Sequence, residues 1–242
     1  MQPRQNIAKS ACEIVEEEVR RLFINKSSEA LRNIPAKEIL TSKVVEHINS
    51  YYKLGQEDYI DFTFEDDKKN LRIENENIIY NENNHSHDSY IWIINFIHDY
   101  ENFCRKLPFW SLSLSISRNN ETLFSIITNP ILNLLIFSEK GSGSVNNQRK
   151  ARSVTSSEEI MISKSNDITV PANLSKFKSL SLNSVSIELI FLCMGIIDIF
   201  VLSHSDYNKY QDCILIAKEA GILLKEHDKY LLLANEKNMA TL

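Results

Sequence analysis

Three side chains in the polar stretch after residue 80 are of types that bind metal ions, namely His85, His87 and Asp88. Imidazole and carboxylate groups are common ligands of zinc and related metals. Nothing close to them in the sequence completes a ligand set, and the surrounding Asn-rich sequence is typical of a loop. We therefore favour a solvated loop, with metal binding as the alternative.

A second group of candidate residues is basic. The segment Gln148–Arg152 carries three positive charges in five residues, so it could contact an anion or RNA, although a solvated hairpin loop is the favoured interpretation. Lys106, Lys209 and Lys218 could be nucleophiles by type. The sequence shows neither a paired base nor an apolar pocket to activate them, which favours solvated side chains.

The composition of the 242-residue chain is that of a globular protein, with 43% hydrophobic and 24% charged residues. Its net charge of −5 argues against a broad electrostatic contact with nucleic acid. The four cysteines form no CxxC pair, which predicts buried free thiols in a reducing compartment. Met1 to Val15 has no apolar signal sequence, and the apolar run 187–202 is too short to span a bilayer. These features predict a soluble, cytoplasmic protein.

Hydrophobic periodicity predicts helices and strands in an order typical of an α/β or α+β fold. Helices are expected at 7–23, 36–52, 173–177, 184–193 and 210–220. Strands are expected at 59–64, 78–80, 90–97, 110–116, 122–128, 132–138, 159–163, 198–202, 222–224 and 230–233. The polar stretch 144–157 separates an N-terminal half, 1–150, with a large mostly antiparallel sheet from a C-terminal half, 151–242, with a smaller mixed sheet. We expect the halves to form one compact structural unit.

Several segments resemble the inositol monophosphatases, a family of metal-dependent phosphomonoesterases. The family signature W-I-I-D-P-I-D-G-T-T-N-F corresponds to residues 92–103, which read W-I-I-N-F-I-H-D-Y-E-N-F. Weaker matches follow in the family's order and spacing: Pro108-Phe109, Thr128-Asn129-Pro130, Gly141-Ser-Gly143, the segment from Asn183 to Asp198, and Lys218–Gly221. The resemblance covers about 90 to 233 and implies the layered αβαβα sandwich of that family.

The resemblance also implies where metal ligands would lie. In the family, two or three Mg²⁺ ions are held by a Glu, by both Asp of D-P-I-D, by the carbonyl between them and by a further Asp. The corresponding positions here are Glu82, Asn95, His98, the carbonyl of Ile97, and Lys209. Glu82 is thus the only carboxylate kept, whereas Mg²⁺ prefers hard, charged oxygen ligands. Glu82 and Ile97 are at most a remnant of a metal site, and no cofactor is expected.

The phosphate-binding positions of the family are altered as well. Its glycine and threonine, whose amides and hydroxyl hold phosphate, are replaced by Asp99 and Tyr100. A carboxylate at position 99 would repel a phosphate in an anion nest. No catalytic residue is therefore assigned with confidence to the positions Glu82, Asn95, His98, Tyr100 and Lys209.

These changes lead to two functional hypotheses. In the first, the protein has lost Mg²⁺-dependent phosphatase activity and acts as a binding or regulatory protein or as a dimer partner. In the second, it is an active phosphomonoesterase for inositol 1-phosphate or a related sugar phosphate, with a site rebuilt around His98 and Glu82 and holding Mg²⁺ or a softer metal. The expected partners are a second copy or a paralogue, and a small phosphorylated ligand. No membrane is expected, and contact with nucleic acid or the transcription machinery has no support in the sequence.

Overall fold

The computed structural model describes residues 2–33, 36–51, 58–64, 67–74, 77–80, 89–153 and 159–240. Its internal contacts divide the chain into two compact units, Met1–Leu135 and Ile136–Leu242, and each is described separately below. The division into halves at 1–150 and 151–242, which the sequence predicts, remains a prediction.

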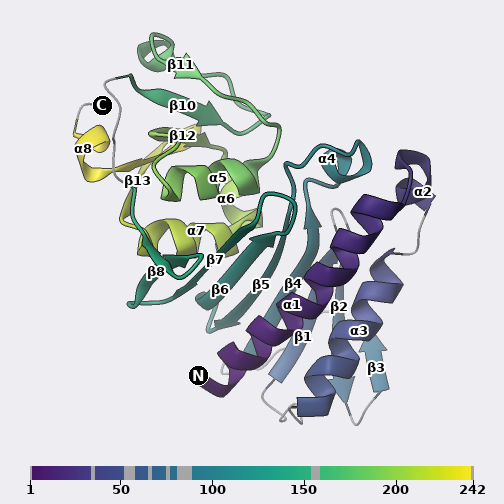
Figure 1. Cartoon of the computed structure of the whole chain (residues 1–242). Coiled ribbons are helices and arrows are strands. Elements are labelled where there is room, and N and C mark those ends of the chain that lie inside the picture. Colours follow the sequence, from purple (N-terminus) through teal and green to yellow (C-terminus); the bar gives the residue numbers. More distant parts are fainter. Residues whose placement is uncertain are drawn as a thin grey trace. The chain divides into compact units, whose positions relative to one another are not determined.

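Four helices belong to the first unit: α1 (Gln2–Asn25), α2 (Ser28–Asn33), α3 (Ala36–Tyr51) and α4 (Tyr100–Cys104). The apolar stripe of α1 includes Ala8, Val15 and Val19, which are at most 1% exposed, and it recurs at the helical spacing of three to four residues. Figure 1 shows α1 and α3 lying side by side, and α1 also packs on the sheet at β5 and β6. This stripe therefore buries the helix against the sheet.

Six strands lie within the described residues of the first unit: β1 (Asp58–Phe64), β2 (Asp67–Glu74), β3 (Asn77–Tyr80), β4 (Tyr90–His98), β5 (Ser111–Arg118) and β6 (Glu121–Asn129). Their order in the sheet is β3-β2-β1-β4-β5-β6. Only β1 and β4 pair in parallel, and the other neighbours are antiparallel. Asn119 and Asn120 join β5 to β6 with φ of 54° and 59°, the left-handed values of a type I′ turn. The large, mostly antiparallel sheet was predicted.

Strand β7 (Leu134–Glu139) begins at the end of the first unit and lies mostly in the second. It pairs in antiparallel fashion with β8 (Gly143–Asn146), which pairs in the same way with β9 (Arg149–Ala151). The basic loop predicted at 148–152 is wrong in part, because Arg149 to Ala151 form a strand. The turn before it, at Asn147 and Gln148, has φ of 43° and 70°, which suits a two-residue hairpin. The Ser144 hydroxyl is buried and donates to the carbonyl of Ile216 at 2.7 Å, so this polar strand has a packed inner face.

Five further strands form a mixed sheet of order β11-β10-β12-β14-β13. Their bounds are β10 (Met161–Lys164), β11 (Lys178–Ser179), β12 (Ile199–Leu202), β13 (Ile222–His227) and β14 (Tyr230–Asn235). Strand β10 runs parallel to β11 and β12, whereas β14 is antiparallel to β12 and β13. Residues such as Ile162, Ile199, Val201 and Leu232 form one core on this sheet. The predicted mixed sheet is confirmed.

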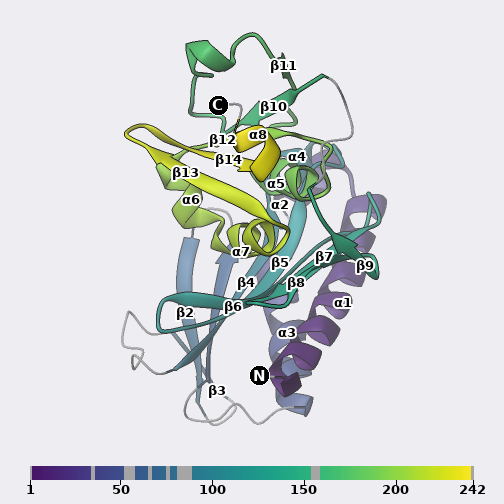
Figure 2. The ribbon, with the colours of Figure 1, turned by 90° about the vertical axis from the view of Figure 1, so that its left-hand side faces the viewer.

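The helices of the second unit are a 3₁₀ turn (Ala172–Leu174), α5 (Val185–Cys193), α6 (His204–Lys209), α7 (Gln211–Glu219) and α8 (Glu236–Met239). The hydroxyl of Ser184 caps α5 by accepting from the amide of Ile187 at 3.3 Å. Helix α7 ends before Gly221, which has a φ of 87°. Glycine adopts this left-handed conformation without strain, and it commonly ends a helix. Figure 2 shows α7 beside the hairpin of β13 and β14. Helices and strands thus alternate here as the sequence predicts for an α/β fold.

The four cysteines are buried and form no disulfide, as predicted. Burial raises the pKa of the Cys193 thiol to about 12, so this side chain stays a protonated, unreactive thiol at neutral pH. Across the described part of the chain, no helix combines the length and the hydropathy of a membrane span.

Candidate functional site

Asn95 and His98 lie on the same face of the sheet although they are three residues apart in β4. Side chains at odd spacing point to opposite faces of a regular strand. Here Asn95 pairs with Ser113 and His98 with Ser111, so β4 uses three residues where β5 uses two. This is a β-bulge, which shifts the alternation by one residue and aims both side chains to one side. The bulge thus places the two side chains on one face of the sheet, as two ligands of a single site would have to be.

Both side chains form hydrogen bonds with a single hydroxyl. The His98 Nε2 atom lies 2.9 Å from the Ser113 Oγ atom, and the Asn95 Nδ2 atom donates to the same oxygen at 3.2 Å. His98 is 5% exposed and Ser113 is fully buried. A buried polar group is strongly destabilising when it has no partner, so Ser113 gives both replacement residues a stable place in the fold. Sequence analysis missed Ser113, because it lies in a regular Ser/Leu alternation of β5 that resembles an ordinary strand.

Asp99 sits at the start of α4 in the left-handed conformation, with φ of 61° and ψ of 49°. Its carbonyl oxygen accepts from the amides of Asn102 at 2.9 Å and Phe103 at 3.3 Å, so its backbone begins the helix. Glycine adopts this conformation freely, whereas other residues are strained in it. The backbone at position 99 therefore keeps the shape that suits the glycine of the family signature, although this chain has an aspartate there.

This strain predicts a difference between two variants at one position. Asp99→Gly and Asp99→Ala both remove the carboxylate, but only alanine must place a Cβ atom in the left-handed region. We expect the glycine variant to be more stable to urea by about 1 kcal/mol. Equal midpoints of urea unfolding for the two variants, with equal slopes, would show that position 99 carries no such strain.

Tyr100 and Glu101, which replace two threonines of the signature, bind helix α2 instead. The Tyr100 hydroxyl donates to the carbonyl of Leu31 at 2.9 Å. The Glu101 carboxylate accepts from both terminal nitrogens of Arg32 at 2.9 Å and from Arg105 at 2.5 Å. These hydrogen bonds, first from Arg32 and then from Arg105, lower the pKa of Glu101 to about 2. Both side chains are thus committed to holding α2 against α4.

Asn129, of the Asn-Pro motif, is fully buried and uses both ends of its amide. Its Oδ1 atom accepts from the amides of Ile131 at 2.9 Å and Leu132 at 2.7 Å. Its Nδ2 atom donates to the carbonyl of Pro108 at 2.7 Å and to that of Trp110. The motif is therefore explained by structure: an asparagine joins the turn after β6 to the segment before β5.

The remaining predicted residues are placed as follows. Ile97 is buried at the bulge, and Glu82 lies outside the described residues, as do His85, His87 and Asp88. Lys209 is exposed at the end of α6 in the second unit, with its Nζ atom 5.5 Å from the centre of the Tyr210 ring. The predicted convergence of Lys209 with Asn95 and His98 stays a prediction.

The other two lysines have ordinary structural surroundings. Lys218 is exposed near the end of α7. The Lys106 ammonium donates to the carbonyl of Phe23 and lies 5.0 Å from the centre of that ring. Burial lowers the pKa of Lys106, yet its amine is already used to join α4 to α1. Neither side chain has the surroundings of a nucleophile.

The residues of β4 do not fit a magnesium site. Asn95 and His98 offer an amide and an imidazole where carboxylates would be needed, and both already form hydrogen bonds with Ser113. Mg²⁺ is held in proteins mainly by carboxylates and water. Within the described ranges, no three His, Cys, Asp or Glu side chains are grouped so that they could hold a metal ion.

The sequence matches no protein-family model, and a comparison with curated proteins gives no match. Solved structures do match. The extragenic suppressor protein suhB from Bartonella henselae superposes with a TM-score of 0.73 at 15% identity, over 98% of this chain and 95% of that one. An IMPase from Thermotoga maritima gives 0.71 at 18% identity, over 98% and 94%. An inositol monophosphatase from Anabaena gives 0.67 at 15% identity, over 100% and 96%. The chain therefore has the fold of the inositol monophosphatases, as its motifs predicted.

Proposed function

We propose that this protein has lost Mg²⁺-dependent phosphatase activity and acts as a binding or regulatory protein in the cytoplasm. The observation that carries the proposal is the shared hydrogen bonding of Asn95 and His98 to Ser113. Two aspartates at these positions would need cations close by. Asn95 and His98 instead form hydrogen bonds with a serine of the same sheet, so both side chains have a polar partner that requires no metal.

The neighbouring positions support the same conclusion. A phosphate ester carries negative charge, and the carboxylate of Asp99 would oppose its binding at the start of α4. Tyr100, at the position of a phosphate-binding threonine, has its hydroxyl on the carbonyl of Leu31. A two-metal phosphatase uses its ions both to make the nucleophile and to stabilise the leaving oxygen. The changes at Asn95 and His98 affect the binding of those ions, and the changes at Asp99 and Tyr100 affect the binding of the phosphate group.

The test is a phosphatase assay of the purified protein with inositol 1-phosphate, in MgCl₂ and separately in MnCl₂, after elemental analysis of bound metal. We expect release of phosphate no faster than in the buffer alone, because three of the positions that would hold the ions are Asn95, His98 and Lys209 and lack a carboxylate. Turnover that is clearly above this background and abolished by Glu82→Gln would instead support the alternative, an active phosphomonoesterase with a rebuilt site.

A regulatory protein of this kind needs a partner, and we propose a second copy or a paralogue. Mass photometry of the purified protein tests the first case, with a dimer mass as the expected result. A monomer at all accessible concentrations would leave the paralogue as the partner, which affinity purification from the native host can test.

A further inference from the structure

We propose that a hollow in the second unit, beside strand β9, binds a small phosphorylated ligand such as a sugar phosphate or a mononucleotide. The hollow has a volume of about 500 Å³ and is lined by β8, β9, the end of α7 and the start of α8. Pockets for small molecules commonly have volumes of about 300–1,000 Å³. Asn95, His98 and Asp99 are not among the residues that line the hollow, and the proposal does not depend on the loss of phosphatase activity.

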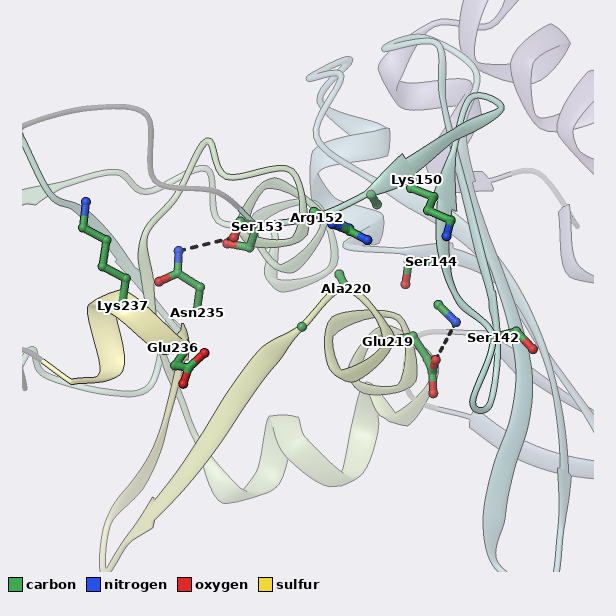
Figure 3. A pocket seen from close by; sticks show the side chains of 13 residues that line it. Ser142, Ser144, Lys150, Arg152, Ser153, Glu219, Ala220, Asn235, Glu236 and Lys237 are labelled. Atoms are coloured by element: carbon green, nitrogen blue, oxygen red, sulfur yellow. Dashed lines mark hydrogen bonds between the residues drawn. The ribbon is translucent and has the colours of Figure 1, made fainter.

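Cationic side chains gather at this hollow. Lys150 and Arg152 extend from the β9 segment and Lys237 from α8, and all three line it. Figure 3 shows Lys150 and Arg152 toward one end and Lys237, with Glu236, toward the other. Residues 140–153 contain four basic residues and no Asp or Glu, in a chain whose net charge is −5. This local excess of positive charge favours the binding of an anion.

Two carboxylates, of Glu219 and Glu236, line the hollow, and that of Glu219 is already engaged. Both oxygens of Glu219 accept from backbone amides, one from Gly141 and one from Gly143, each at 2.7 Å. Gly141 and Gly143 have φ of 78° and 80°, the left-handed values that turn successive amides toward one anion. By contrast, no ion pair to Lys150 or Arg152 is found among the described residues.

Polar groups without partners complete the lining. The Ser153 hydroxyl lines the hollow and has no hydrogen-bond partner in the described structure. A second hollow, of about 510 Å³, is lined by the same Lys150 and Arg152 together with Arg149 and Asn146, and the Asn146 Oδ1 atom likewise has no partner there. Unsatisfied buried polar atoms are unusual in folded proteins. A sugar phosphate in the first hollow would supply the phosphate for the cations and a hydroxyl for Ser153.

The guanidinium of Arg152 and the ammonium of Lys150 would contact the phosphate in different ways. Arginine presents a planar fork that binds two phosphate oxygens at once, whereas lysine acts as a point charge. Replacing Arg152 by Lys should therefore weaken binding less than replacing it by Ala, but should not leave it unchanged.

The test is isothermal titration calorimetry with two probes, inorganic phosphate and adenosine 5′-monophosphate. We expect both to bind the wild-type protein, and the double variant Lys150→Ala/Arg152→Ala to bind at least 10-fold more weakly, since charge-assisted hydrogen bonds are lost. A matched control, Lys225→Ala/Lys229→Ala, removes two exposed lysines from the hairpin of β13 and β14 and should change affinity less than 2-fold. Unchanged thermal midpoints check that each variant folds.

Two results would overturn the proposal. In one, both double variants lose affinity equally, which would mean that only the overall charge matters. In the other, neither probe binds at 20 mM, while a single-stranded RNA of twenty nucleotides binds through Lys150 and Arg152. The basic strand would then be a nucleic-acid contact rather than a site for a small ligand.

Discussion

Replacing Asn95 and His98 together by aspartate is expected to lower the free energy of unfolding by about 3 kcal/mol in metal-free buffer. The new carboxylates would lie beside Ser113 at the bulge, where burial of charge without a counter-ion is strongly destabilising. In a protein of this length, each kcal/mol moves the melting temperature by about 2–4 °C. Differential scanning calorimetry in EDTA should therefore show a drop of roughly 6–12 °C.

Magnesium should reverse much of this loss in the double variant and leave the wild-type protein unchanged. A ligand present at about 100 times its Kd stabilises the folded state by about 2.7 kcal/mol. The control Asn95→Gln/His98→Asn keeps both positions neutral and should not respond to MgCl₂. Adding Lys209→Asp to the double variant tests whether position 209 belongs to the same ligand set, because the response to Mg²⁺ should then increase.

A melting temperature of the wild-type protein that rises in MgCl₂ would contradict the proposed loss of the metal site. A double variant as stable as the wild type in EDTA would show something different, namely that the face bearing Ser113 is open to water and that Asn95 and His98 are not needed for stability. The two outcomes are therefore distinguishable, and neither requires an activity assay.

The sequence motifs pointed to Asn95 and His98 but not to the contact with Ser113 that the two side chains share. Residues 90–98 are nearly all apolar, so no alternation of polar and apolar side chains reveals which face each one takes. The bulge between Asn95 and His98 depends on the register against β5, which is a tertiary property. Ser113 could not be chosen from a strand in which every second residue is serine.

The hairpin of β8 and β9 was missed for a related reason. Ser, Asn, Gln and Arg are typical of loops, and this composition predicted one at 144–157. In the structure, Ser144 of β8 forms a hydrogen bond with Ser138 of β7 at 2.5 Å on the buried side, while Arg149 and Lys150 of β9 remain exposed. This packing against β7 is a tertiary contact that local composition does not reveal. By contrast, the helices at 184–193 and 210–220 were predicted within one residue of their ends, because their apolar periodicity and capping residues are local signals.

The Asn-Pro motif yields the second large effect, through Asn129→Asp. This change keeps the shape of the side chain but replaces the Nδ2 donor by an oxygen that faces the carbonyls of Pro108 and Trp110. Two hydrogen bonds become two repulsive contacts in a fully buried site. We expect the variant to lose about 3–4 kcal/mol of the free energy of unfolding at pH 8, measured by urea denaturation.

The loss should shrink as the pH falls, which separates this explanation from a simple packing defect. Burial and the two carbonyls favour the protonated acid, which can donate a hydrogen bond again, so the pKa of the new carboxyl in the folded state lies above its unfolded value. The folded variant then binds more protons than the unfolded chain, and its stability falls as the pH rises through that interval, by up to about 1.4 kcal/mol per pH unit. The difference from wild type at each pH is the relevant quantity, since other groups titrate equally in both proteins.

Asn120→Asp, in the exposed turn, is the matched control and should differ from wild type by less than about 0.5 kcal/mol at every pH. A loss for Asn129→Asp that is the same at pH 5 and pH 8 would mean that the amide of Asn129 does not face these carbonyls.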